Sequence, residues 1–277
     1  MSTEAPESGF RVYVIAADPD AAYEAAADAV AAGEVIVLPT DTVYGVGADA
    51  FSPEAVQRLL DAKQRGRDMP PPVLVAEVEM IRSLSARYDD VVLALAEAFW
   101  PGPLTLILRS HPSLQMDLGD RLGTIAVRVP DHDFTRELLR QTGPLAVSSA
   151  NVSGQDAALS IADATAQLGD AVSVYLDAGA MAGPVPSTIL DLSGDSPRVL
   201  RAGRLSVADL NRAVPGLLVQ EELQSAAEEA VREEQDEAPV AEAEAEPEAS
   251  EAPTQPDADA EPEASEDATQ GDPGADA

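Results

Sequence analysis

Short apolar runs rich in β-branched residues alternate with helical patterns from about residue 10 to residue 215, and this alternation constrains the fold most strongly. Each run is too short for a helix and is bounded by glycine, proline or polar residues, which is typical of buried strands. The alternation predicts a single α/β domain over 10–215. We expect strands at 10–16, 35–38, 73–76, 104–109, 124–129, 145–147, 172–176 and 198–201, helices at 20–32, 53–63, 85–100, 134–141, 161–168 and 207–214, and loops at 39–47 and 182–192.

The pattern changes near Gln220. Residues 221–277 contain 21 acidic residues and one basic residue, so they carry −20 of the formal charge of −33 and leave −13 for the preceding chain. Their Ala, Glu, Pro and Asp composition has no apolar period and cannot bury enough surface to fold. We therefore expect 216–277 to be an acidic, low-complexity, disordered tail and 1–9 to be a flexible N-terminus.

Composition excludes several classes of protein. The chain has no cysteine, which rules out disulfides, thiolate metal sites and cysteine nucleophiles. Both histidines, His111 and His132, lie beside turn-forming residues, and structural or surface roles are expected for them. The sequence shows neither a signal peptide nor an apolar run of membrane-spanning length, so a cytoplasmic protein with no membrane partner is expected. The acidic body argues against broad, nonspecific nucleic-acid binding.

Two of the expected strands end in loops rich in hydroxyl groups. PTDTVYGVG at 39–47 follows the strand 35–38, and SSANVSG at 148–154 follows the strand 145–147. A rigid strand end fixes where polar groups point, so such loops are common places for binding sites. Two glycines in the first loop permit unusual backbone angles or close approaches. Each stretch alone is also compatible with an ordinary strand and turn, so a site requires complementary groups elsewhere.

Cationic residues supply candidates for those groups. Lys63, Arg65 and Arg67 lie in a loop interrupted by glycine and proline, which is either a solvated surface or a phosphate clamp. No GxxxxGK[ST] or convincing GxGxxG stretch is present, so a nucleotide would be held by side chains. Arg128 interrupts the strand 124–129. It either is buried against an anion or a carboxylate, or faces solvent from an edge strand, and the sequence leaves both alternatives open.

Seven short motifs, taken in order, resemble the YrdC-like family of threonylcarbamoyl-AMP synthases in its single-domain form. The resemblance covers about residues 10–210 and implies a twisted mixed β-sheet flanked by helices, with a concave substrate cavity. The motifs are PTDTVYGVGA at 39–48, KQR at 63–65, PGPLT at 101–105, AVRVP at 126–130, SSANVSG at 148–154, PSTILD at 186–191 and RAG at 201–203.

The resemblance implies an enzyme, a nucleotidyltransferase that makes threonylcarbamoyl-AMP and pyrophosphate from L-threonine, bicarbonate and ATP. The product would pass to a tRNA threonylcarbamoyl transferase complex for N6-threonylcarbamoyladenosine formation, and direct contact with tRNA is possible. Catalysis needs no nucleophilic side chain, because N-carboxylated threonine attacks the α-phosphorus itself. Mg2+ is expected to arrive with ATP, since no carboxylate cluster suggests a dedicated metal site.

The same resemblance assigns roles to individual residues. Lys63 and Arg65 are the expected catalytic pair near the phosphates. L-Threonine or its carbamate is expected to contact Thr42, Arg128, Ser149 and Ser187, and ATP is expected to contact Arg65, Thr124, Asn151, Ser160 and Arg201.

Three positions depart from the family pattern. Met69 stands where many relatives have a polar residue, Leu74 stands near a usual histidine, and Asp41 replaces a frequent glutamate. A contact with threonine or the nucleotide can therefore be lost or moved. The alternatives are a noncatalytic RNA-binding protein of the same fold, a carbamoyl-transfer domain of the hydrogenase-maturation type, and a protein that acts chiefly through its acidic tail. The short chain and the lack of cysteine disfavour the second.

Overall fold

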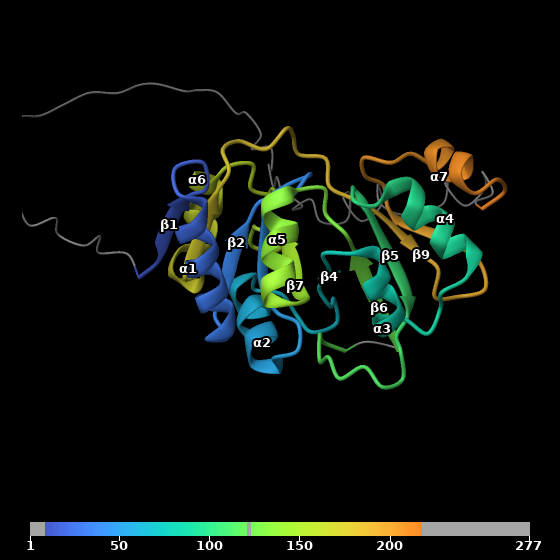
Figure 1. Ribbon diagram of the computed structural model, residues 1–277, viewed down its shortest axis with the longest axis horizontal. Coiled ribbons are helices and arrows are strands. Elements are labelled where there is room, and N and C mark those ends of the chain that lie inside the picture. The colour runs from blue at the N-terminus through green and yellow to red at the C-terminus, as the bar shows by residue number, and fades with distance from the viewer. Residues whose placement is uncertain (1–8, 121–122, 218–277) are drawn as a thin grey trace, which may run out of the picture. The chain divides into compact units, whose positions relative to one another are not determined.

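The computed structural model describes residues 9–120 and 123–217, and within them the strands form one mixed sheet (Figure 1). The sheet order is β1-β8-β2-β3-β7-β4-β6-β5-β9-β10. Apart from residues 9, 216 and 217, the expected N-terminal and C-terminal tails lie outside the described residues. The strands are β1 (Arg11–Val14), β2 (Ile36–Leu38), β3 (Gly45–Asp49), β4 (Val73–Leu74), β5 (Leu104–Arg109), β6 (Thr124–Arg128), β7 (Leu145–Ser149), β8 (Val174–Asp177), β9 (Thr188–Asp191) and β10 (Arg198–Arg201).

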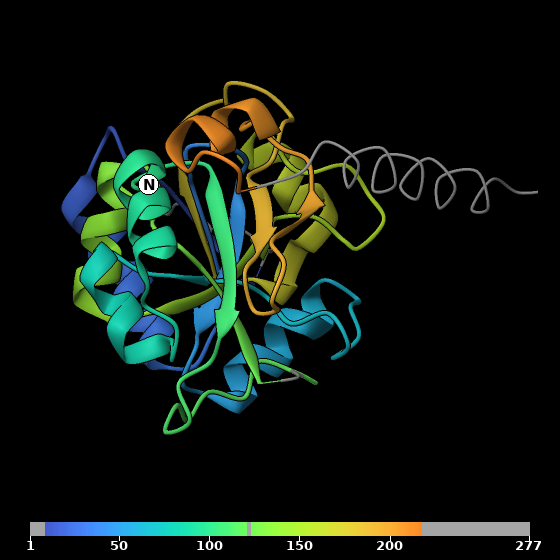
Figure 2. The ribbon, with the colours of Figure 1, turned by 90° about the vertical axis from the view of Figure 1, so that its right-hand side faces the viewer.

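Helices cover both faces of the sheet, as Figure 2 shows. Alternate residues of a strand point to opposite faces, and β2 follows this rule. Ile36 and Leu38 pack in the cluster that contains α1 and α5, whereas Val37 packs in the cluster that contains α2, α4 and α6. The helices are α1 (Pro19–Ala31), α2 (Pro53–Ala62), α3 (Ile81–Leu84), α4 (Asp90–Phe99), α5 (Asp133–Thr142), α6 (Ile161–Leu168) and α7 (Val207–Ala213), with short 3-10 helices η1 (Val78–Met80) and η2 (Gly169–Ala171).

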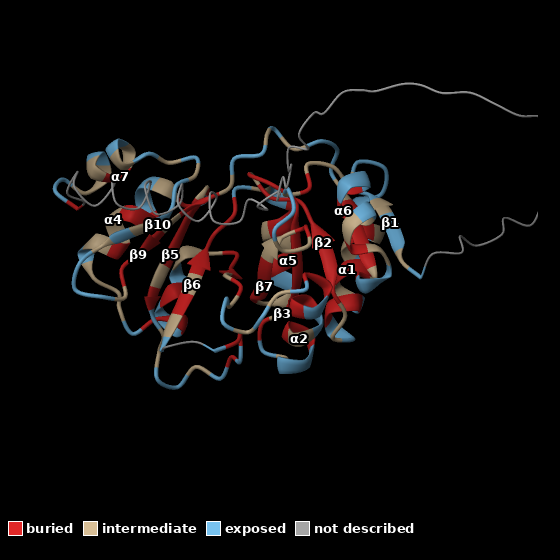
Figure 3. Cartoon of the chain, turned by 180° about the vertical axis from the view of Figure 1, so that it is seen from behind, coloured by how far each residue is buried: buried red, intermediate tan, exposed pale blue. Residues whose placement is uncertain are grey.

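Buried residues fill the inner strands of the sheet, whereas the edge strands β1 and β10 are largely exposed (Figure 3). Parallel and antiparallel pairs occur in the one sheet, so the mixed sheet flanked by helices that the resemblance implies is confirmed. Tyr23 of α1 and Phe134 of α5 stack with ring centroids 4.0 Å apart, which joins the two helices over one face. Among the helices of the described residues, none is both long enough and apolar enough to cross a membrane.

Two predicted loops contain strands, and in this respect the sequence-based prediction was wrong. The loop 39–47 gives way to β3, which pairs antiparallel with β2 and β7. A Cβ atom on Gly45 would lie 2.6 Å from Val147 Cγ1, so the glycine allows close packing in the sheet. The loop 182–192 contains β9. Two prolines precede this strand and an aspartate ends it, and these residues obscure the strand pattern.

The helix expected over 85–100 is shorter in the structure. Helix α4 begins at Asp90, because the side chain of Asp89 accepts a hydrogen bond from the backbone N–H of Val92 and so caps the helix. Ser85 instead forms an isolated antiparallel bridge with Ser110. Residues 85–89 therefore connect α3 to α4, and the bridge attaches their first residue beside the end of β5.

Candidate active site

A cavity of about 370 Å³ lies over the part of the sheet that runs from β3 to β10. Its apolar wall includes Ile107 of β5 and Ile189 of β9, and its charged lining residues are Arg65, Arg128 and Arg201. Among the described residues that line this cavity, none is acidic. Three arginines around a cavity of this size favour a ligand with several negative charges.

Arg128 is buried in the interior strand β6, between β4 and β5, and only 6% of the residue is exposed. Its Nη2 lies 2.6 Å from Oδ1 of Asp41, and the same oxygen accepts a hydrogen bond of 3.0 Å from the backbone N–H of Asp131. Burial lowers the pKa of Arg128, and the Asp41 carboxylate opposes that shift. The alternative of an edge strand with Arg128 in solvent is therefore wrong.

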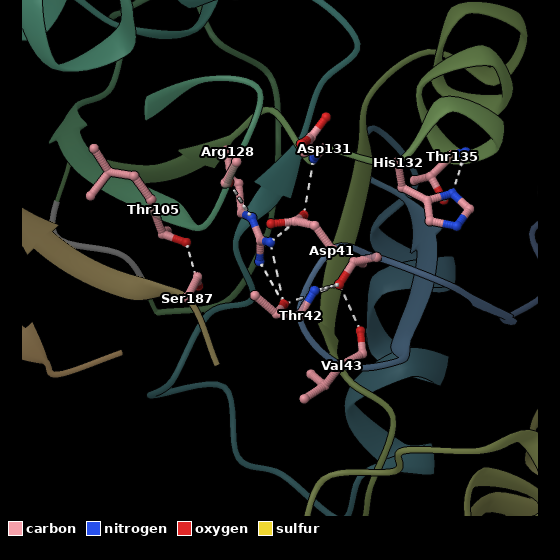
Figure 4. Close-up of polar contacts among 12 residues, drawn as sticks. Asp41, Thr42, Val43, Thr105, Arg128, Asp131, His132, Thr135 and Ser187 are labelled. Atoms are coloured by element: carbon pink, nitrogen blue, oxygen red, sulfur yellow. Dashed lines mark hydrogen bonds and ion pairs between the residues drawn. The ribbon is translucent and has the colours of Figure 1, made fainter. Parts of the chain in front are cut away.

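The hydroxyl of Thr42 lies beside this ion pair (Figure 4). Thr42 Oγ1 accepts hydrogen bonds of 3.2 Å from both Nη atoms of Arg128 and lies 3.1 Å from Thr40 Oγ1. The Thr40 hydroxyl donates to the carbonyl of Val43 at 2.7 Å. The Thr40 hydroxyl already donates its proton to Val43, so it can only accept from Thr42. The Thr42 oxygen accepts from Arg128, and its own hydroxyl proton can be donated either to Thr40 or to a ligand in the cavity.

Helix α5 anchors the loop that carries Thr42. The hydroxyl of Thr135 donates to the carbonyl of Pro39 at 2.6 Å, and Nδ1 of His132 accepts from the backbone N–H of Thr135 (Figure 4). His132 thus caps α5, which is the structural role expected for it. The packed helix holds the loop after β2 in place.

Lys63 lies behind the cavity rather than in its lining, and it is 2% exposed. Its Nζ donates to the carbonyls of Ser149 at 2.6 Å and Asn151 at 2.7 Å, while its own carbonyl accepts from the backbone N–H of Ser153. Burial, followed by repulsion from Arg65, lowers the pKa of Lys63 to about 8. The ammonium group therefore holds the loop after β7 from within.

Arg65 reaches the cavity from the end of α2 and donates from Nη1 to Ser148 Oγ at 3.1 Å. Its Nε is buried and has no hydrogen-bond partner among the described residues, and the same holds for Oδ1 of Asn151. Buried polar atoms without partners are uncommon, and a bound ligand is one explanation for them. Both atoms belong to residues that the family resemblance predicts to contact the nucleotide.

Arg201 at the end of β10 forms the opposite side of the cavity. Its Nη2 donates to the carbonyl and the hydroxyl of Ser187 at 2.9 and 3.0 Å. Ser187 Oγ in turn lies 3.0 Å from Thr105 Oγ1 (Figure 4). Burial lowers the pKa of Arg201, and repulsion from Arg128 and Arg65 lowers it further. The guanidinium groups thus repel one another, which an anion between them would relieve.

The structure brings most of the predicted site residues together. Seven of them line the cavity, namely Thr42, Arg65, Thr124, Arg128, Ser149, Ser187 and Arg201. Lys63, Asn151 and Ser160 do not belong to its lining. Ser160 instead forms the capping box of α6 with Asp163. The ligand contacts assigned to all of these residues stay predictions.

Sequence reasoning missed several residues of the site. Thr105 and Ser148 line the cavity and lie within recognised motifs, but nothing in their spacing distinguishes them from their neighbours. Thr40 and Tyr44, which also line it, belong to the loop expected to carry a site but have no ligand contact assigned to them. Asp41 lies in the same loop and replaces a glutamate that is frequent in the family, but the sequence assigns it no role. The signal that could have identified it is the buried arginine itself, because such a group requires a carboxylate nearby.

The apolar departures from the family pattern also lie at the cavity. Met69 and Leu74 both line it, and 48% of Met69 is exposed.

The aromatic residue Tyr44 is fixed by its hydroxyl, which donates to the carbonyl of Gly179 at 2.6 Å. In the described part of the chain, no three His, Asp, Glu or Cys side chains gather as they would around a metal ion.

The fold and the cavity define an α/β protein in which three arginine side chains, rather than a glycine-rich phosphate loop, offer positive charge to a ligand. Residues 28–203 match the family model Sua5/YciO/YrdC, described as telomere recombination. The chain belongs to this family.

Relatives and solved structures agree with this assignment. A Mycobacterium leprae protein, provisionally named a threonylcarbamoyl-AMP synthase, is 53% identical over 195 residues, which are 69% of this chain and 89% of that protein. The Bacillus subtilis threonylcarbamoyl-AMP synthase is 32% identical over 200 residues, 72% of this chain and 58% of that protein. The crystal structure of Pyrococcus abyssi Sua5 complexed with L-threonine superposes with a TM-score of 0.67 at 32% identity, covering 70% of this chain and 57% of that one.

Proposed function

We propose that this protein is an L-threonylcarbamoyladenylate synthase. Relatives that carry this name match across the α/β domain, and one related structure was solved with L-threonine. The observation that carries the proposal is the cavity itself, where Arg65, Arg128 and Arg201 converge from three separate segments and no described lining residue is acidic. Such a site can bring a carboxylate and a triphosphate together despite their mutual repulsion.

The chemistry requires positioning more than a reactive side chain. Threonine nitrogen combines with bicarbonate, with loss of water, to give the N-carboxylate. One oxygen of that carboxylate attacks the α-phosphorus of ATP, the bond to the β-phosphate oxygen breaks, and pyrophosphate leaves. Arg65 and Arg201 would stabilise charge on the phosphates, and Arg128 with Thr42 would orient the threonine end.

Magnesium belongs to the nucleotide in this proposal. Because the described residues offer no cluster of three metal-binding side chains, Mg2+ would enter bound to ATP and keep water ligands. Lys63 would act through the loop that contains Ser149 and Asn151, since its ammonium already donates to both carbonyls.

The product is a mixed anhydride, and a transferase complex would consume it to form N6-threonylcarbamoyladenosine in tRNA. Direct contact of this chain with tRNA is a separate expectation. A steep fall of tRNA affinity with added salt would support it, because such binding depends on phosphate contacts.

Pyrophosphate release from ATP tests the function. Threonine and bicarbonate are supplied together and then omitted in turn, and release is expected only with both. Arg128→Ala and Arg201→Ala are expected to lower release by about 100-fold, whereas Arg212→Ala, an exposed control on α7, is expected to leave it unchanged. Absence of release in a folded chain that binds ATP would contradict the proposal and favour the noncatalytic RNA-binding alternative.

A further inference from the structure

The guanidinium of Arg128 is almost fully used by the protein. Nε donates to the carbonyl of Gly102 at 3.0 Å, Nη1 and Nη2 each donate to Thr42, and Nη2 also donates to Asp41. An arginine has five N–H groups, so the contacts of the described residues leave one N–H, on Nη1, for a ligand. In this arrangement Arg128 cannot bind an anion in the bidentate manner, with two parallel hydrogen bonds.

Asp41 also balances the charge of Arg128. The side chains are 12% and 7% exposed, and their closest atoms are 2.6 Å apart. Asp41 is held in turn by the backbone N–H of Asp131, so it joins the loop after β2 to the loop after β6 (Figure 4). This end of the cavity therefore holds a neutral ion pair rather than a free cation.

The other two arginines of the cavity differ from Arg128. Among the described residues, the buried Nε of Arg65 has no partner and its Nη1 donates to a serine hydroxyl, while Arg201 donates only to oxygens of Ser187. Neither forms an ion pair with a carboxylate of the described residues. Asp68 raises the pKa of Arg65 without forming an ion pair with it, and Arg204 adds positive charge near Arg128. The difference among the three arginines is therefore one of direct pairing, since among the described residues Arg128 alone of the three contacts a carboxylate.

We propose that Asp41 is a specificity-determining residue that keeps polyphosphate away from the threonine end of the cavity. By neutralising Arg128 and occupying Nη2, it leaves an end suited to an amino acid with one carboxylate, while Arg65 and Arg201 attract the phosphates. This inference rests on the proposed function for the identity of the two ligands. Its physical basis is that a multiply charged anion gains most from uncompensated cations.

Calorimetric binding of inorganic pyrophosphate tests the proposal directly. Asp41→Asn keeps the shape of the side chain but removes its charge, so Arg128 becomes a free cation and pyrophosphate is expected to bind about tenfold more tightly. Asp41→Glu, which keeps the charge, is expected to bind pyrophosphate as the wild type does. A purely structural role for Asp41 predicts unchanged or weaker binding in Asp41→Asn, and that result would overturn the proposal.

A matched control comes from another ion pair of the domain. Glu77 bridges Arg136 and Arg140 away from the cavity lining, and Glu77→Gln removes a carboxylate without adding charge to the cavity. It is expected to leave pyrophosphate affinity unchanged. A tenfold gain in this variant would show that any lost carboxylate has the same effect and would contradict a specific role for Asp41.

A double variant keeps the proposal testable if Asp41→Asn does not fold. In Asp41→Asn combined with Arg128→Gln both partners are neutral, and pyrophosphate affinity is expected to stay within about twofold of the wild type. A tenfold loss would mean that Arg128 already binds phosphate, contrary to the proposal. These measurements need no turnover, so failure of the synthase reaction in the wild type is seen separately, in pyrophosphate release.

Discussion

At the scale of single residues, Arg65 shows how a candidate ligand-binding side chain can lower the stability of the folded chain. Its buried Nε lacks a partner among the described residues, and burial lowers its pKa despite the nearby Asp68. A buried cation without full compensation destabilises the folded chain unless an anion binds to it. In the proposed function, ATP would supply the partner for this side chain that the protein does not.

Arg65→Ala is therefore expected to separate activity from stability. Its kcat/KM for ATP should fall about 100-fold, or roughly 2.7 kcal/mol, because charge stabilisation of the phosphates is lost. The free energy of unfolding in urea should stay equal or rise. Arg67→Ala serves as the control in the same loop, since Arg67 pairs with Asp117, and its activity should stay within about fivefold of the wild type. A large loss of stability in Arg65→Ala would contradict this explanation.

Lys63 gives a prediction about pH. Burial lowers its pKa from the ordinary value of 10.5 to about 8 in the folded chain, so between these values the unfolded chain binds a proton that the folded chain has released. The free energy of unfolding should consequently rise with pH from about 8 to about 10, by up to roughly 3 kcal/mol. Subtracting the same curve for Lys63→Met removes the contributions of other groups. A difference that is flat over this window would mean that Lys63 keeps an ordinary pKa.

At the scale of elements, the end of α2 decides where Arg65 points. Gln64 adopts a left-handed conformation with φ of 52°, and the backbone N–H groups of Arg65 and Gln64 donate to the carbonyls of Leu60 and Asp61. This is a Schellman motif, in which glycine is the usual residue at the left-handed position. The turn directs the chain, and with it Arg65, from the helix toward the cavity.

Gln64→Gly is expected to stabilise the fold by about 0.5–1 kcal/mol, because glycine adopts the left-handed conformation without steric cost. The gain should be seen as a higher urea midpoint with an unchanged slope, and kcat should be unaffected since the backbone path is the same. Gln64→Val should lower stability by about 1–2 kcal/mol. If the glycine variant were less stable, the cap would depend on a contact of the glutamine side chain.

Local patterns predicted the strands and helices better than their arrangement. The β-branched run of β2 and the capped start of α2 lie where expected, since both depend on neighbouring residues. The strand β3 was missed because its glycines are explained only by Val147 and Leu38, which approach from other strands. Arg128 and Asp41, 87 positions apart, meet because of the sheet order, and no local pattern contains that order.

At the scale of the whole molecule, the cationic cavity belongs to a strongly acidic chain. The formal net charge is −33, of which residues 221–277 carry −20. If ATP is the substrate, as proposed, this net charge would repel it at long range, and the arginines would attract it only at short range. The Debye length falls from about 30 Å at 0.01 M salt to about 8 Å at 0.15 M, so salt screens the distant repulsion more than the contacts inside the cavity.

The association rate of ATP is accordingly expected to rise with salt, by roughly fivefold between 10 and 150 mM NaCl, instead of falling as it does for oppositely charged partners. Deleting residues 221–277 leaves a net charge of −13 and should reduce the rise to less than about twofold, while pyrophosphate release is retained. Stopped-flow binding of ATP measures both, with zwitterionic threonine as the control whose association should not depend on salt. A rate that falls with salt in the full chain would mean that the field of the arginines extends well beyond the cavity and governs encounter despite the acidic surroundings.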